Sequence, residues 1–173
     1  CEPETRFEDA KKELEETQKR IEESDKNKDS IFLAAPIQGG RHLDLRLKAA
    51  QMASKTNADL FPIGGVVPLM EKNNFKMLAE VIIASKKGLD TSKPVHLFGC
   101  GHPMLFALAT FLGCDLFDSS SYAKFASRDS LMFTWGTRNL EELEIIPSEF
   151  SAAPGININE LKAMEKKERQ KII

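Results

Sequence analysis

The sequence is poor in cysteine, carries almost no net charge and contains no long apolar run. Its three cysteines, Cys1, Cys100 and Cys114, are spaced neither as a metal knuckle nor as a disulfide framework. This usage favours a reducing compartment, and we expect a cytoplasmic protein. No stretch approaches the roughly 18 apolar residues that a membrane span needs. The formal net charge of −2 creates no global positive field, so any binding of nucleic acid has to depend on local groups.

The first segment of the chain is typical of an amphipathic helix. Residues 4–24 carry apolar side chains at three- and four-residue steps, which predicts one buried stripe. Thr5 and Glu8 have the spacing of a capping box at its start. The stripe consists of Phe7, Ala10, Leu14, Thr17 and Ile21.

Four short apolar runs then alternate with helical patterns. The runs cover 31–37, 60–63, 95–98 and 114–117, and each is followed by glycine or polar residues. Helices are expected over 43–56, 71–87, 103–112 and 121–127, with a charged helical tail over 157–173. Continuous apolar runs between helices predict parallel strands covered by helices.

The predicted fold class is therefore α/β, with about four parallel β-α units. Such units form either a small open sheet or half of a (β/α)₈ TIM-type barrel, because a closed barrel needs about eight of them. A half-barrel exposes two sheet edges, which normally have to be paired or covered. This architecture predicts a partner, which is either a second half or another copy of the chain.

Polar residues and glycines gather where the predicted strands end. Gln38 follows the first run, Gly64 and Gly65 follow the second, Gly99 follows the third and Asp118 follows the fourth. Ligands of parallel α/β folds lie at the carboxyl ends of the strands. One interpretation is a pocket in which the amide of Gln38 binds a planar polar molecule beside the carboxylate of Asp118.

Each of these residues also has a plain structural interpretation. Glycines after strands are most often turn residues, and Asp118 has the position of a helix cap. His102 precedes Pro103 and is expected in a loop or cap, whereas His42 and His96 are expected to be structural or exposed. Cys100 and Cys114 are expected in the core.

Four longer segments resemble one known family. They are "PIQGGRHLDLR" (36–46), "PIGGVVPLME" (62–71), "PVHLFGCGHPMLFALATFLGCDLFDSSSYAKFA" (94–126) and "GTRNLEELE" (136–144), and they closely resemble the archaeal tRNA-guanine transglycosylases. The resemblance implies a (β/α)₈ barrel that exchanges a guanine in tRNA for a 7-deazaguanine base, in the archaeal branch the precursor of archaeosine. It also implies that Asp118 is the nucleophile, that Gln38 reads the base, and that Gly65, with Gly64 and Val66 beside it, contacts the base.

The sequence departs from this family in two respects. Residues 1–147 match only the later half of the barrel, so we expect activity only with a separate N-terminal half or in a homo-oligomer. The family places three cysteines and a histidine after a proline, but Ser148 and Phe150 stand in their place after Pro147. Since no cysteine follows Cys114, residues 148–173 are expected to form a degenerate zinc segment and a charged helix, with no metal and no other cofactor.

Three hypotheses follow. The first is a transglycosylase subunit that binds tRNA and reacts through a covalent aspartyl-ribose intermediate. The alternative is a non-catalytic subunit that binds tRNA or stabilises a partner, and the third is an unrelated small-molecule site on the same scaffold. Candidate phosphate contacts are Arg41, Arg46, Arg128 and Arg138, although a solvated surface explains each of them equally well.

Overall fold

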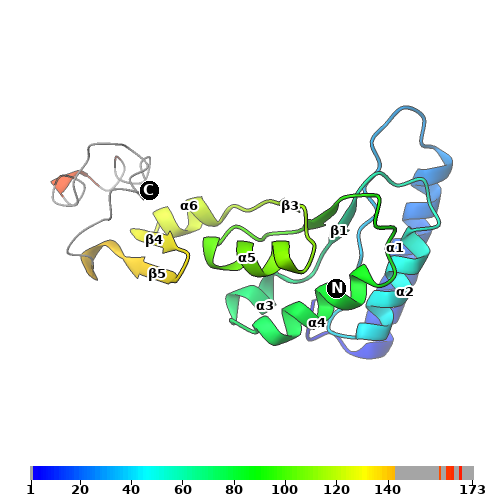
Figure 1. Ribbon diagram of the computed structural model, residues 1–173, viewed down its shortest axis with the longest axis horizontal. Coiled ribbons are helices and arrows are strands. Elements are labelled where there is room, and N and C mark those ends of the chain that lie inside the picture. The colour runs from blue at the N-terminus through cyan, green and yellow to red at the C-terminus, as the bar shows by residue number, and fades with distance from the viewer. Residues whose placement is uncertain (1, 143–159, 161–162, 166–167, 169–173) are drawn as a thin grey trace. The chain divides into compact units, whose positions relative to one another are not determined.

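The computed structural model describes residues 2–142, 160, 163–165 and 168 (Figure 1). The chain divides into two compact units, which are described separately. Unit 1 contains Cys1–Cys100 and Leu108–Asp118, and unit 2 contains Gly101–Ala107 and Ser119–Ile173.

Unit 1 is built on a parallel three-stranded sheet. Its strands are β1 (Phe61–Ile63), β2 (Val95–Leu97) and β3 (Leu116–Phe117), in that spatial order. All three lie within predicted apolar runs, so the parallel α/β prediction is confirmed for these strands. β1 is buried at every position, as a parallel strand is when both faces of its sheet are covered.

The first apolar run forms no regular strand. It contacts the sheet through two isolated parallel bridges, from Ala34 to Leu60 and from Ile37 to Ile63. Ala35 N donates to Leu60 O at 2.9 Å and Ile37 N donates to Pro62 O at 2.7 Å. Pro36 between them has no N–H, so it offers no donor to a strand on the other side of this segment. The first of the four predicted strands is therefore present only as an extended segment beside β1.

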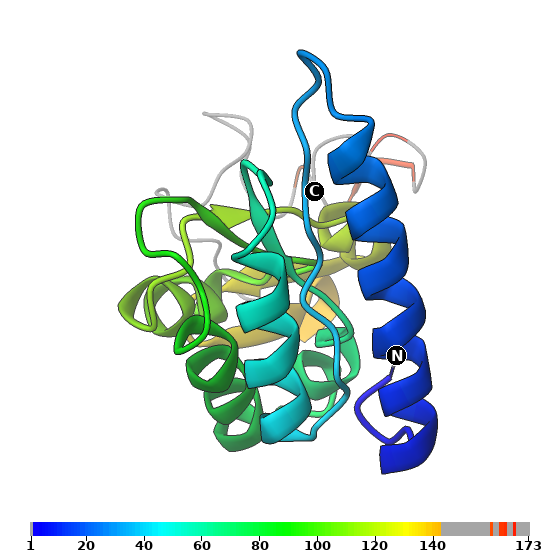
Figure 2. The same ribbon diagram turned by 90° about the vertical axis from the view of Figure 1, so that its right-hand side faces the viewer.

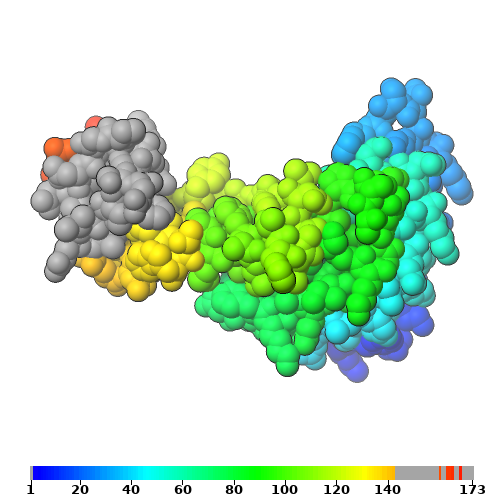
Figure 3. Space-filling model, in the orientation of Figure 1, coloured from blue at the N-terminus to red at the C-terminus, as the bar shows by residue number. Residues whose placement is uncertain are grey.

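The beginning of the same run lies at the surface. Ile31 and Phe32 are 69% and 66% exposed. The segment that follows the first helix, light blue in Figure 3, projects from the rest of unit 1. These two apolar side chains do not contribute to the core that the pattern predicted.

Helices cover the sheet of unit 1. They are α1 (Phe7–Lys26), α2 (Leu43–Ala53), α3 (Val67–Glu71) and α4 (Phe75–Lys86), and α5 (Pro103–Phe111) is divided between the two units. α1 and α2 lie side by side, as Figure 2 shows. Ala10, Leu14 and Ile21 of the predicted stripe are buried, which confirms that part of the prediction. Phe7 is 39% exposed, and Gln18 is buried in place of Thr17.

Two helix predictions are wrong in detail. The capping box does not form, because the N-cap of α1 is Arg6 and no side chain caps it. The helix expected over 71–87 begins later, because α4 covers Phe75–Lys86, and the short helix α3 (Val67–Glu71) that precedes it was not predicted. Asn73 adopts a left-handed φ of 54° between them, and the Asn74 side chain caps α4 by accepting from Met77 N at 3.3 Å.

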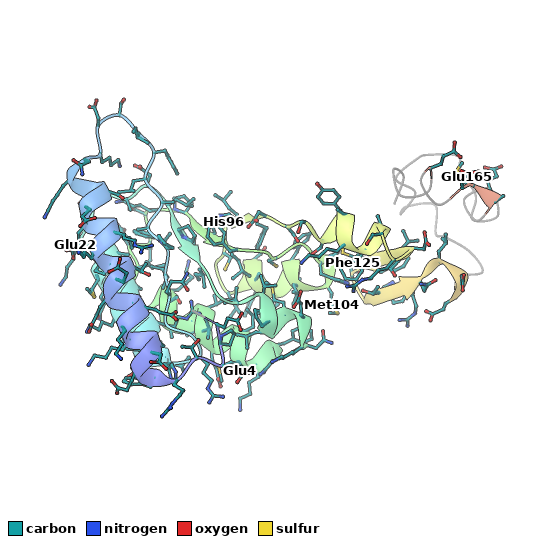
Figure 4. The ribbon with its side chains drawn as sticks, turned by 180° about the vertical axis from the view of Figure 1, so that it is seen from behind. Glu4, Glu22, His96, Met104, Phe125 and Glu165 are labelled. Atoms are coloured by element: carbon teal, nitrogen blue, oxygen red, sulfur yellow. The ribbon has the colours of Figure 1, made fainter. Side chains whose placement is uncertain are left out.

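Unit 2 contains helix α6 (Ser121–Ala126), strands β4 (Ser130–Phe133) and β5 (Gly136–Asn139), and the 3₁₀ turn η1 (Leu140–Glu142). The antiparallel β4–β5 hairpin was not predicted. His102 Nε2 lies 2.9 Å from Thr137 Oγ1, and its ring meets that of Phe125 edge-on, the latter labelled in Figure 4. His102 Nδ1 also accepts from Met104 N at 3.2 Å, so the loop-and-cap prediction for His102 is confirmed.

The predicted zinc-segment equivalent at 148–156 and most of the predicted helix at 157–173 lie outside the described residues. Within the part of the chain that the structure describes, no helix is both long and apolar enough to cross a membrane.

Candidate active site

The strand register of unit 1 places the candidate residues in one row. Ile37 pairs with Ile63, Ile63 pairs with Leu97, and Leu97 pairs with Phe117. The next residue along each segment therefore belongs to the following row, which consists of Gln38, Gly64, Phe98 and Asp118. Adjacent strands are about 4.8 Å apart, so this row is roughly 14 Å wide. Gln38 lies at one end of the row and Asp118 at the other.

Gln38 presents an acceptor that no described residue satisfies. Its side-chain oxygen Oε1 is buried, yet it has no hydrogen-bond partner among the described residues. The amide lies directly against Gly64, where a Cβ would come 2.8 Å from Gln38 Nε2. Gly64 therefore makes room for this amide. A buried acceptor without a donor is unfavourable, and a bound molecule with an N–H group would satisfy it.

The residues after Gly64 turn the chain from β1 into α3. Gly65 has a φ of 68°, which a residue with a side chain rarely adopts. Val66 is 0% exposed, so its side chain belongs to the core and only its backbone could meet a ligand. Of the two, Gly65 is the residue whose backbone the turn leaves accessible, since it is only partly buried.

The prediction for Arg46 is wrong. This residue was expected to contact phosphate, but it is 0% exposed. Its guanidinium donates to three backbone carbonyls, those of Gly40 at 2.8 Å, Ile37 at 2.9 Å and Gly64 at 2.8 Å. Burial lowers the pKa of Arg46 to about 10. Arg46 thus joins the two loops that carry Gln38 and Gly64, and its role is to hold them together.

Asp118 is the most exposed polar residue of the row, with 57% of its side chain accessible. Its Oδ1 accepts a hydrogen bond from Gly99 N at 3.1 Å. The N-cap of α6 is Ser120, so the interpretation of Asp118 as a helix cap is wrong. Asp115, by contrast, has a structural contact, because its Oδ2 accepts from Val95 N at 2.8 Å.

A histidine that sequence reasoning set aside lies beside this carboxylate. His96 Nε2 is 2.9 Å from Asp118 Oδ1, and 15% of the His96 side chain is exposed. The N–H direction is not aligned with the oxygen, and Nε2 has no other partner in the described part of the chain. The expectation that His96 is merely structural or exposed therefore misses its contact with Asp118. A pairing of the third and fourth apolar runs would have found this contact. In that register His96 pairs with Leu116, which lies two residues before Asp118.

The predictions for the two cysteines and for His42 are confirmed. Cys100 and Cys114 are 1% and 2% exposed, so their placement in the core is confirmed. His42 Nε2 lies 2.9 Å from Thr5 O, which confirms its structural role. Arg41 is exposed and lies 3.5 Å from Glu4 in unit 1.

In unit 2, Arg128 and Arg138 are both exposed. The Arg138 guanidinium lies 4.9 Å from the ring centre of Trp135. Arg41, Arg128 and Arg138 therefore remain candidates for phosphate contact. Among the described residues, no group of three or more His, Cys, Asp or Glu side chains is arranged to hold a metal ion.

The chain is similar to known proteins over most of its length. The family model described as "Queuine tRNA-ribosyltransferase" (TGT) matches residues 1–152. The tRNA-guanine(15) transglycosylase of Methanocaldococcus jannaschii is 46% identical over 99% of this chain and 27% of that protein. The enzyme of the same name from Archaeoglobus fulgidus is 48% identical over 82% of this chain and 29% of that protein. That from Thermococcus kodakarensis is 44% identical over 99% of this chain and 29% of that protein. The chain thus spans less than a third of the length of these relatives.

Proposed function

The chain belongs to the queuine tRNA-ribosyltransferase (TGT) family, and from this premise we propose that it carries the nucleophile of a tRNA-guanine transglycosylase. In this proposal the substrate is tRNA, and a 7-deazaguanine base replaces a guanine. Asp118 attacks the ribose, and Gln38 with Gly64 and Gly65 contacts the base. The observation that carries the proposal is the shared row: an accessible carboxylate and an unsatisfied buried amide oxygen lie on one edge of the sheet.

The chemistry suits a carboxylate in this position. One oxygen of the Asp118 carboxylate forms a bond to the ribose C1′ while the bond from C1′ to the guanine nitrogen breaks. Guanine leaves with the electron pair and takes up a proton from water. The covalent ester is then displaced by the incoming base, which loses its own proton. Two displacements at one carbon retain the configuration, as in retaining glycosidases. The target nucleotide has to leave its stack for this reaction, as in other base-exchange and base-repair enzymes.

The proposal also includes further strands that complete the sheet. β3 is the last strand of the described sheet, and Leu116 within it is 46% exposed. In a TIM-type barrel, both edges of such a sheet are paired. We propose that residues 1–147 correspond to the later half of the barrel and that an N-terminal half, or another copy of the chain, supplies the rest.

The competing function is a non-catalytic subunit of the same family. The absence of any cysteine after Cys114 favours it, because the family's metal segment has lost its ligands in this sequence. A protein of this kind would keep the fold and the tRNA contacts but would not need the carboxylate of Asp118.

The test is a matched pair of substitutions. The tagged chain is purified from its own host with any co-purifying protein, and the incorporation of labelled guanine into tRNA is measured. Asp118→Asn removes the nucleophile and should lower exchange by at least about 10³-fold, with loss of the covalent protein–tRNA band on a denaturing gel. Asp115→Asn is the control; it keeps an oxygen that can accept from Val95 N and should exchange at the parental rate. Exchange that persists in Asp118→Asn would select the non-catalytic subunit.

A further inference from the structure

The strand register brings His96 to Asp118. His96 lies in β2 and pairs with Leu116 of β3. Leu116 and Asp118 are two residues apart, so their side chains point to the same side of the extended chain. The side chain of His96, labelled in Figure 4, therefore leans along the sheet toward Asp118, and Nε2 reaches Oδ1 at 2.9 Å. Phe98 meets the imidazole edge-on at 4.7 Å between ring centres and limits its rotation.

The two oxygens of Asp118 are not equivalent. Oδ1 accepts from Gly99 N at 3.1 Å and faces His96 Nε2, whereas no hydrogen bond to Oδ2 forms among the described residues. A carboxylate held through one oxygen has little freedom to rotate, and its second oxygen keeps its lone pairs for attack. This asymmetry is what a nucleophile with a defined attacking atom needs.

We propose that His96 is the positioning residue for Asp118: its Nε2–H donates to Oδ1, so that Oδ2 is the attacking atom. This inference rests on the proposed function. When Oδ2 bonds to the ribose C1′, Oδ1 becomes the carbonyl oxygen of the ester and still accepts from both donors. When the incoming base displaces the ester, the electron pair of the broken bond returns to the carboxylate. The charge that develops on Oδ1 is then stabilised by His96 and Gly99. No proton is transferred by His96 in either step.

The present misalignment of the N–H is consistent with this role, because hydrogen bonds in a catalytic site commonly tighten only in the substrate complex. The geometry disfavours a role for His96 as the base that deprotonates the incoming nucleobase, since Nε2 lies 2.9 Å from Oδ1, an acceptor that favours a proton on Nε2. If His96 acted through packing alone, an aromatic ring of similar size would replace it without loss.

Two substitutions separate positioning from packing. His96→Phe keeps a flat ring against Phe98 and removes the donor, while His96→Gln keeps an N–H at a similar reach. In the exchange assay, His96→Phe should lower kcat by about 10- to 100-fold, as the loss of one donor to a developing charge does, with the KM for tRNA unchanged within about twofold. His96→Gln should recover most of kcat. The control is His42→Phe, the same change at a histidine that contacts Thr5, and it should keep the parental kcat.

A second measurement does not depend on activity or on the folding of a variant at position 96. The imidazole ¹⁵N spectrum of the unaltered chain should show a proton on His96 Nε2, and this resonance should move in Asp118→Asn. An Nε2 without a proton, or a resonance that does not respond, would overturn the inference.

The kinetic outcomes are separable. If the parent does not exchange guanine with its co-purifying protein present, the proposed function fails and the role of His96 fails with it. If the parent is active, Asp118→Asn is inactive and His96→Phe keeps the parental kcat, the positioning role alone is wrong.

Discussion

At the scale of single residues, two thiols titrate outside their usual range. Burial raises the pKa of Cys100 to about 11, and the charge of Asp118 adds to the effect. Burial likewise raises the pKa of Cys114 to about 12. Both thiols are therefore protonated at neutral pH, and neither has the low pKa of a reactive cysteine.

This gives a prediction for stability in alkali. The pKa of each thiol is near 9 in the unfolded chain and higher in the folded chain. The contribution of such a group to stability is complete below pH 9, and it is lost as the pH rises toward the pKa of the folded chain. The free energy of unfolding should therefore fall between about pH 9 and pH 11, measured by urea denaturation. The variant with Cys100→Ala and Cys114→Ala should show a shallower fall. An identical slope in both proteins would contradict the assignment, because lysines titrate equally in the two.

At the scale of structural elements, the loops after the extended segment and after β1 act as one unit. Arg46 donates to the carbonyls of Ile37, Gly40 and Gly64, which lie on both loops. Gly39 has a φ of 143°, and a Cβ there would come 3.0 Å from Arg46 N. The Gln38 amide rests on Gly64 in the same cluster. The orientation of this amide thus depends on small residues and on one buried cation, and not on its own hydrogen bonds.

The dependence of Gln38 on Gly64 can be measured. In Gly64→Ala the new Cβ would lie 2.8 Å from Gln38 Nε2, and the amide, being the end of a flexible side chain, would swing away. The free energy of unfolding should change by less than about 1 kcal/mol, because only the amide has to move. The KM for the incoming base should rise by about tenfold, the equivalent of one lost hydrogen bond.

The double variant provides the control. Gln38→Ala alone should raise the same KM by a similar factor, and adding Gly64→Ala should have no further effect, since the contact is already gone. If the two changes instead multiplied, Gly64 would act on the base independently of Gln38.

At the scale of the whole molecule, charge limits how this chain can bind RNA. With a formal net charge of −2, attraction to phosphates has to come from individual exposed cations. Arg41, Arg128 and Arg138 are exposed, whereas Arg46 is fully buried and cannot contribute. Binding of tRNA should consequently be weak at physiological salt unless a partner adds further contacts.

The salt dependence of tRNA binding tests this assignment. The binding constant K for labelled tRNA is measured by fluorescence anisotropy at several salt concentrations, and log K is plotted against log salt. Each substitution that removes a phosphate contact should lower the magnitude of the slope by about one. The substitutions are Arg41→Gln, Arg128→Gln and Arg138→Gln. Arg20→Gln is the matched control, because Arg20 is 74% exposed on α1 and pairs with Glu16 in its own helix. If Arg20→Gln lowered the slope as much as the substitutions of Arg41, Arg128 and Arg138 do, the tRNA would be attracted by the charged surface as a whole. The assignment of phosphate contacts to these three arginines would then be wrong.

The sequence by itself determined the elements and the family. The alternation of apolar runs with helical patterns predicted four parallel strands, of which three form. The residues that end them, including Asp118 and Gly64, were named from the sequence alone. These features are local, since periodicity and turn residues act within a few positions along the chain. The late start of α4 at Phe75 was also local in origin, at Asn73 and Asn74, but the apolar pattern masked it.

The tertiary structure alone decided which side chains work together. Arg46 looked like a surface cation and became the buried link between two loops. His96 looked incidental and lies against Asp118. Both outcomes depend on strand register, which pairs residues about twenty positions apart along the chain. Register follows from how whole strands and helices bury their apolar faces together, so no short stretch of sequence contains it.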